Sequence, residues 1–198
     1  MKYDLLAIGN ALVDIEVQVG DEFIKKNSLT KGGMTLSSIE SQQKILNALK
    51  KFSTKMSSGG SAANTVHGFS VLGGKTYYLG RVADDFHGQH YAKDMQSCGV
   101  AFSETRNGTS NTGTCVVLVT PDSERTMLTH LGASSSLHPD NVDEKTIEDS
   151  SMVYIEGYLW TSKETRNAAE KLATVAKNNK IPVAFTLSDA FVVNSFKD

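Results

Sequence analysis

A pair of adjacent glycines in the stretch MSSGGSAANTVHGFSVLGG is the first feature of this sequence that could do chemistry. Gly59 and Gly60 precede an apolar run with helical spacing, which predicts that the pair lies at a helix N-terminus. The residues of this helix that we expect to face the core are Ala63, Val66, Phe69 and either Val71 or Leu72. Free N–H groups and the positive end of the helix dipole attract oxygen-rich ligands there, and missing Cβ atoms allow close approach. Asn64, one turn into the helix, could donate and accept toward the same ligand. A plain glycine turn is the alternative.

A second glycine pair, Gly73-Gly74, comes close to a phosphate-binding P-loop without forming one. In GFSVLGGKT an extra glycine stands between Gly73 and Lys75, which breaks the G-x4-G-K-T spacing. A P-loop also lies between a strand and the helix that follows it, whereas this pair follows a helical run and precedes a strand-like run. We therefore interpret Gly73-Gly74 as a helix C-cap.

The elements that must position these residues alternate between strand and helix patterns. Residues 5–8 and 75–82 predict strands, and residues 38–52 predict an amphipathic helix with Ser37 or Ser38 as its N-cap. The clearest unit is a right-handed βαβ crossover over residues 152–188. This alternation predicts a three-layer, Rossmann-like α/β fold with helices on both faces of a parallel sheet.

Two segments do not fit a buried parallel sheet. Residues 11–19 and 112–130 alternate apolar and polar positions, and the second contains a hairpin that turns at Pro121-Asp122. A strand with one polar face belongs at a surface rather than between two helical layers. We therefore assign these segments to a separate small β-sheet that covers the site.

The composition of the 198-residue chain limits the function classes. A formal net charge of −2 with mixed signs gives no basic stripe, so we expect no nucleic-acid partner. No apolar run approaches the ~18 residues of a membrane span and the N-terminus has no signal-peptide cleavage site, so we expect a cytoplasmic protein without a membrane partner. Cys98 and Cys115 are not in CxxC spacing, and His87 and His90 have no third partner, so we expect no disulfide and no metal site.

Several motifs resemble one enzyme family. The run GGSAANTVHGFSVLGGKTYYLGRVADDFHG resembles the first signature of the ribokinase-like (PfkB) carbohydrate kinases. The segment GNALVD resembles the family's substrate strand, and YIEGYLWT with TLSDAF resembles the adenosine kinase branch. The resemblance extends over essentially the whole chain. Its G-x-V-x-x-D-x-x-G positions are filled by Gly80, Val82, Asp85 and Gly88.

The resemblance implies a set of acceptor-binding residues. A carboxylate such as Asp14 can accept from two vicinal hydroxyls at once, and the glycine pair would let a ribose lie flat on the backbone. Arg125 resembles an arginine of the adenosine kinase lid hairpin, although an exposed hairpin arginine is an equally good interpretation. The implied substrate-binding residues are Asn10, Asp14, Gly59, Gly60, Asn64 and Arg125.

The catalytic half of the family pattern is absent from this sequence. The second signature, Asp-Thr-x-Gly-Ala-Gly-Asp, supplies the family's general base and anion hole, and nothing here matches it. The run NVDE, Asn141–Glu144, matches the family's magnesium motif but precedes the strand it should follow, so we interpret it as a capping box. We therefore expect no catalytic residue in this chain and a general base beyond Asp198. ATP and Mg²⁺ belong to the full-length protein, and we expect neither to be bound by this chain alone.

These inferences combine into one interpretation with two alternatives. Residues 1–198 form the N-terminal part of one ribokinase-like domain, with lid segments at approximately 11–36 and 107–131. The full-length protein transfers a phosphoryl group from ATP to a hydroxyl of a sugar or nucleoside of adenosine or ribose type. The first alternative is a non-catalytic sugar- or nucleoside-binding protein, and the second is an interaction domain that forms a homodimer through the small sheet.

Overall fold

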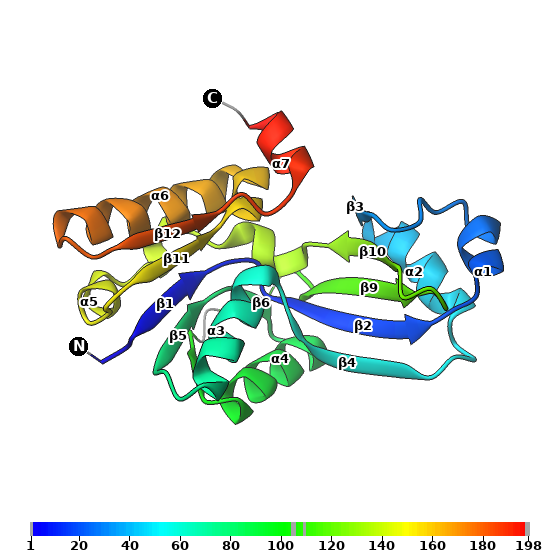
Figure 1. Cartoon of the computed structure of the whole chain (residues 1–198), viewed down its shortest axis with the longest axis horizontal. Coiled ribbons are helices and arrows are strands. Elements are labelled where there is room, and N and C mark those ends of the chain that lie inside the picture. The colour runs from blue at the N-terminus through cyan, green and yellow to red at the C-terminus, as the bar shows by residue number, and fades with distance from the viewer. Residues whose placement is uncertain (1, 104–105, 109, 197–198) are drawn as a thin grey trace.

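The computed structural model describes residues 2–103, 106–108 and 110–196 and is built on two five-stranded sheets that lie end to end (Figure 1). The first sheet is parallel throughout and has the strand order β12-β11-β1-β5-β7. Its apolar central strands are buried on both faces, as expected for a sheet between two helical layers. The strands are β1 (Leu5–Ile8), β5 (Thr76–Leu79), β7 (Val100–Phe102), β11 (Val153–Glu156) and β12 (Val183–Thr186).

Helices cover both faces of the first sheet. On one face lie α3 (Ser61–Val71) and α4 (Phe86–Ser97). On the other lie α5 (Glu144–Glu148) and α6 (Lys163–Asn178), and α7 (Ala190–Ser195) follows β12. This arrangement confirms the predicted three-layer α/β fold.

The second sheet has the order β3-β10-β9-β2-β4 and mixes parallel and antiparallel pairs. Its strands are β2 (Leu12–Gln18), β3 (Met34–Leu36), β4 (Thr54–Gly59), β9 (Gly113–Val119) and β10 (Arg125–His130). Two helices accompany it, α1 (Asp21–Lys26) and α2 (Ile39–Ala48). The predicted separate sheet and its hairpin are therefore present.

Two details of the second sheet differ from the sequence analysis. The sheet includes β4, which lies outside the two segments assigned to a lid. Strand β9 has no polar face, because it is central in the sheet and all but its last residue are buried. Thr109, inside the second lid segment, lies outside the described residues. That these segments move as a lid stays a prediction.

The two sheets are joined by very short connections. Residues 9–11 connect β1 to β2, and Gly60 alone connects β4 to α3. The remaining elements are β6 (Val82–Ala83), β8 (Arg106–Asn107) and three 3₁₀ turns, η1 (Gly132–Ser136), η2 (Pro139–Asn141) and η3 (Gly157–Thr161). The junction therefore collects residues from both halves of the molecule.

Helix ends follow the local sequence with one correction. Ser38 caps α2 by accepting from the Ser41 N–H, and Gly73 follows α3 with a φ of +95°, as a C-cap glycine requires. The run NVDE does open a short helix, as predicted, but Asn141 is not its N-cap and instead closes the capping box of η2 with His138. Helix α5 begins at Glu144, and the carboxylate of Asp143 caps it by accepting from the Thr146 N–H.

The predicted core face of α3 is partly wrong. Ala63 is buried as expected, but Phe69, Val71 and Leu72 are 41%, 69% and 87% exposed. The helix packs on the sheet through small residues near its start, so its later apolar residues point away from the core.

No helix in the described part of the chain is both long and apolar enough to cross a lipid bilayer.

Candidate functional site

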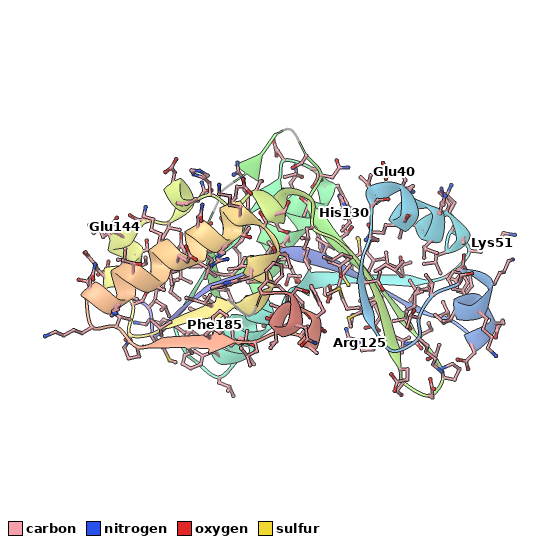
Figure 2. The ribbon with its side chains drawn as sticks, turned by 90° about the horizontal axis from the view of Figure 1, so that it is seen from above. Glu40, Lys51, Arg125, His130, Glu144 and Phe185 are labelled. Carbon is pink, nitrogen blue, oxygen red and sulfur yellow. The ribbon has the colours of Figure 1, made fainter. Side chains whose placement is uncertain are left out.

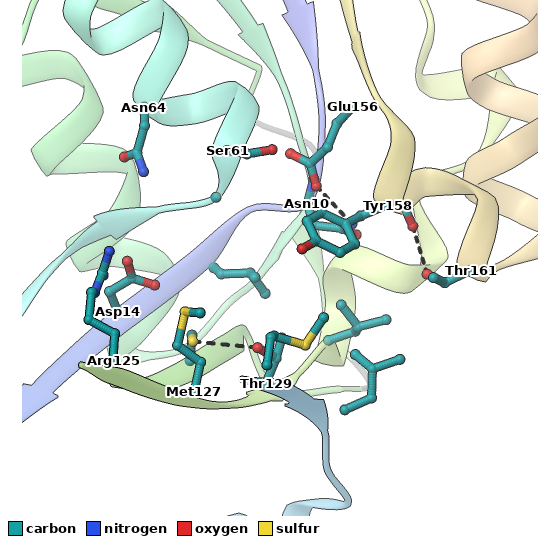
Figure 3. Close-up of a pocket in the computed structure, with 16 residues that line it drawn as sticks. Asn10, Asp14, Ser61, Asn64, Arg125, Met127, Thr129, Glu156, Tyr158 and Thr161 are labelled. Carbon is teal, nitrogen blue, oxygen red and sulfur yellow. Dashed lines mark hydrogen bonds between the residues drawn. The ribbon is translucent and has the colours of Figure 1, made fainter. Parts of the chain in front are cut away.

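A pocket of about 210 Å³ lies at the junction of the two sheets (Figure 3). Side chains from β2, β3, β9 and β10 meet there with the start of α3 and the segment after β11. Five of the six residues predicted for the site line it, namely Asn10, Asp14, Gly60, Asn64 and Arg125. Gly59, the sixth, lies beside Asp14 at the end of β4.

The second sheet contributes the acidic side chain of Asp14 to the site. Burial raises the pKa of Asp14 from 3.8 to about 6, an effect that the positive charge of Arg125 opposes and the negative charge of Glu16 reinforces. Figure 3 shows Arg125, the first residue of β10, next to this carboxylate. Asp14 is therefore ionised at neutral pH but loses its charge under mildly acidic conditions.

The packing of the protein itself requires a glycine at position 60, and a side chain at position 59 would displace the carboxylate of Asp14. A Cβ at Gly59 would lie 2.3 Å from Oδ1 of Asp14, and a Cβ at Gly60 would lie 2.3 Å from the backbone oxygen of Asn10. Gly60 also has a φ of +101°, which side-chain-bearing residues rarely adopt. The pair thus lets three segments of the site come together, in addition to leaving Gly60 open to the pocket.

Glu156, at the end of β11, is a site residue that the sequence analysis missed. Its Oε1 accepts from the backbone N–H of Asn10 at 3.4 Å and from Nδ2 of Asn10 at 3.2 Å, and its Oε2 accepts from the Ala62 N–H at 3.1 Å. Burial raises the pKa of Glu156 above its ordinary value. These hydrogen bonds and one with Ser61 offset part of that effect. A glutamate that ends an otherwise apolar strand, as in VYIEG, was the available signal.

An apolar wall was also missed. It contains Leu12, Met34, Leu36, Cys115, Met127 and Leu131 from the second sheet and the segment after it. Figure 3 shows Tyr158 on the other side of the pocket, on η3. Burial raises the pKa of Cys115 to about 11, so its thiol stays protonated and acts as part of the wall. A pattern of single apolar residues on four separate segments has no local sequence signature.

The arrangement suits a ligand with two chemical parts. Asp14, Asn10 and Asn64 offer hydrogen-bonding groups for hydroxyls, and the apolar wall offers contact for a flat ring. Within the described residues, no group of three His, Cys, Asp or Glu side chains is placed to hold a metal ion. Fold and pocket together define a three-layer α/β protein with a pocket that combines hydrogen-bonding side chains and an apolar wall.

Comparison with known proteins is consistent with this class. Residues 33–196 match the pfkB family carbohydrate kinase, so the chain belongs to that family. The chain is 31% identical to the adenosine kinase of Saccharomyces cerevisiae, with all of this chain and 60% of that protein covered. It is 27% identical to the guanosine-inosine kinase of Escherichia coli, with 96% of this chain and 46% of that protein covered.

Solved structures give the same result for the fold. The crystal structure of adenosine kinase from Sinorhizobium meliloti matches with a TM-score of 0.92 and 36% sequence identity. The match covers all of this chain and 60% of that one. The fold is therefore the ribokinase-like fold of these kinases, and the chain spans at most about 60% of the length of these relatives.

Proposed function

We propose that this chain forms the acceptor-binding part of an ATP-dependent kinase that phosphorylates a hydroxyl of a nucleoside or sugar. The observation that carries the proposal is the pocket itself, in which the Asp14 carboxylate and two amide side chains share a cavity with an apolar wall. A carboxylate accepts from two vicinal hydroxyls, and an apolar wall contacts a flat ring. A nucleoside of adenosine type combines both features and is our preferred acceptor.

Each of these residues has a separate role in binding the acceptor. Asp14 orients the hydroxyls of the sugar, and Arg125 keeps that carboxylate charged by lowering its pKa against the effect of burial. Asn64 approaches from α3, whereas Asp14 and Arg125 come from the second sheet, so the ligand would contact both halves of the molecule. Such contacts fix the position of the reacting hydroxyl, which is how a phosphoryl acceptor is prepared for in-line attack.

ATP supplies the phosphoryl group in this reaction, and Mg²⁺ neutralises its charge. The second family signature is not in the sequence, and the described residues do not provide a cluster that fits a divalent cation. We therefore assign the donor site and the general base to sequence that this chain does not contain. The 198-residue chain alone is expected to bind an acceptor without phosphorylating it.

The test compares this chain with a protein extended to the length of its relatives. Both are incubated with labelled ATP, Mg²⁺ and adenosine, ribose or fructose, and phosphorylated product is measured. Phosphorylation by the extended protein alone supports the proposal. Turnover by the 198-residue chain at more than about a hundredth of the extended rate would show that a base within this chain was overlooked, since each such group contributes about two decades or more.

The second candidate is a sugar- or nucleoside-binding protein without catalysis. The pocket is compatible with it, because a cavity that joins the Asp14 carboxylate to an apolar wall can hold a ligand without any reaction. Adenosine binding without phosphorylation by any longer form would support it. A cytoplasmic location and a homodimer through the second sheet also stay proposals, which fractionation and sedimentation measurements test directly.

A further inference from the structure

Helix α4 makes two hydrogen bonds to the strand that carries the glycine pair. The Tyr91 hydroxyl donates to the backbone oxygen of Gly59 at 3.1 Å, and Oδ2 of Asp94 accepts from the Ser58 N–H at 2.7 Å. Tyr91 and Asp94 are three residues apart, so they lie on the same face of the helix. Tyr91 therefore holds the Gly59–Gly60 peptide itself, and Asp94 holds the Ser57–Ser58 peptide two peptide groups before it.

These contacts matter because a Gly-Gly peptide has little intrinsic preference for one orientation. Neither Gly59 nor Gly60 has a Cβ to restrict φ and ψ, so the peptide between them can rotate at low cost. β4 is also the last strand in the order of its sheet, so strand pairing supports only one side of it. Groups outside the sheet can therefore add to the pairing of Gly59 with Leu12 in fixing the orientation of this peptide.

We propose that Tyr91 and Asp94 are positioning residues that set the orientation of the Gly59–Gly60 peptide and thereby the floor of the pocket. A trans peptide is planar and its C=O and N–H bonds point in opposite directions within the plane, so a Gly59 oxygen held by Tyr91 directs the Gly60 N–H the other way. Gly60 lines the pocket and is the N-cap residue of α3. The consequence for ligand affinity rests on the proposed function, whereas the peptide orientation does not.

Both side chains are held in the state that this role needs. Tyr91 is fully buried, with its ring 5.3 Å from Phe102 and 6.4 Å from Tyr78 between centroids. Burial raises the pKa of Tyr91 well above 10, so its hydroxyl remains a donor. Burial also acts to raise the pKa of Asp94, but hydrogen bonds from Ser58 and the nearby His90 and His67 lower it overall, so its carboxylate remains an acceptor.

The experiment uses Tyr91→Phe, which removes one hydroxyl and no packing. Tyr77→Phe is the matched control. Tyr77 lies on β5, next to Tyr78, and its ring contacts Tyr3 rather than the pocket. Adenosine affinity is measured by calorimetry, and the Gly60 amide is followed by NMR in the ligand-free chain. We expect Tyr91→Phe to weaken adenosine binding about tenfold and to shift or broaden the Gly60 amide signal, because the buried Gly59 oxygen loses its donor. Tyr77→Phe leaves both unchanged.

Asp94 provides a second, independent comparison. Asp94→Asn keeps a side-chain oxygen that accepts from Ser58, so it should retain affinity within about threefold, whereas Asp94→Ala should lose about tenfold. A purely structural role would lower the melting temperature of both variants without this difference. If the wild-type chain binds no adenosine, the proposed function fails, and the Gly60 signal still tests the positioning role. A folded Tyr91→Phe chain with an unchanged Gly60 signal would overturn the inference.

Discussion

At the scale of single residues, the site contains one group whose burial is unfavourable and one whose backbone conformation is unusual. Asp14 is a carboxylate whose ionised form is disfavoured by burial, and Gly60 has a backbone conformation that few residues adopt. Natural proteins keep such features where function needs them. Removing the charge of Asp14 should therefore separate stability from ligand binding, whereas replacing Gly60 should lower both.

Replacing Asp14 by Asn should stabilise the protein while weakening binding. The pKa of Asp14 is about 6 in the folded chain and 3.8 in the unfolded one, so the folded state holds more protons between these values. The contribution of Asp14 to the unfolding free energy therefore falls as the pH rises from about 4 to about 6, and it stays low above that range. Asp14→Asn should be more stable than wild type by about 2 kcal/mol at pH 7 and nearly equal at pH 3.5.

Urea unfolding of both chains at these two pH values measures this difference. Nucleoside affinity of the wild type should also fall as the pH drops below 6, because hydroxyls donate to the ionised form, and Asp14→Asn should lack this dependence. A stability difference that is the same at both pH values would show that Asp14 is not the titrating group.

Gly60 and Gly73 form a matched pair for measuring the glycine requirement. Both have positive φ values, +101° and +95°, but a Cβ at Gly73 meets nothing within 4 Å, whereas a Cβ at Gly60 lies 2.3 Å from the Asn10 oxygen. Gly73→Ala should cost about 1 kcal/mol from backbone strain alone. Gly60→Ala should cost at least about 2 kcal/mol more and abolish acceptor binding, because the connection between Asn10 and α3 must move. Equal losses in chemical unfolding would contradict this account.

At the scale of elements, Asp85 joins the start of α4 to the second sheet. Its Oδ1 accepts from the Gly88 N–H at 2.8 Å and from the Thr112 hydroxyl at 2.7 Å, and its Oδ2 accepts from the Thr112 N–H at 2.8 Å. Thr112 immediately precedes β9, and its hydroxyl oxygen accepts from the Ala83 N–H. One side chain of the G-x-V-x-x-D-x-x-G pattern thus caps a helix and anchors the central hairpin of the second sheet.

Asp85→Ala should therefore cost more than the loss of a helix cap. Asp143→Ala is the comparison, because Asp143 caps the short helix α5 through Thr146 and Lys145, which belong to the same helix. We expect about 1 kcal/mol for the cap alone and about 3 kcal/mol for Asp85, since buried groups of Thr112 lose their partner. Denaturant unfolding measures both variants. Similar costs for the two would mean that the hairpin is anchored elsewhere.

At the scale of the whole molecule, one end of the first sheet exposes apolar side chains. On and just after β12, Val183, Phe185 and Leu187 are 43%, 46% and 62% exposed. Figure 2 shows Phe185 in the half of the molecule that also carries Glu144, and Arg125 in the other half. β12 is also the last strand in the order of its sheet, so its outer N–H and C=O groups are open to pairing.

The 198-residue chain should therefore self-associate through β12. Sedimentation over a range of concentrations should show association in the wild type and much less in Phe185→Lys, because a charge there opposes burial. Thr54→Lys, on the outer strand β4 of the second sheet, should behave as wild type. The opposite pattern would support the homodimer through the second sheet instead.

The helices and strands could be predicted from the sequence better than the residues that pack against them or bond to them. Local periodicity, Ser38 and Gly73 marked helices and their ends correctly, because caps and turns depend on a few neighbouring residues. The exposure of Phe69 and the burial of Gln42, which donates to the oxygens of Thr114 and Leu128, depend on what packs against each helix. Glu156 was missed for the same reason, since its partners lie 94 and 146 residues away in the chain.

The position of β1 has a consequence for how the protein is made. β1 is the third of five strands in its sheet, and Leu6 pairs with Tyr77 on one side and Val153 on the other. During synthesis, the apolar residues of β1 leave the ribosome long before either neighbour exists. Closing such long loops is slow, and β1 can be paired on both sides only after β11 has emerged. Until then the earliest part of the chain has to be protected from aggregation, which is a task for molecular chaperones.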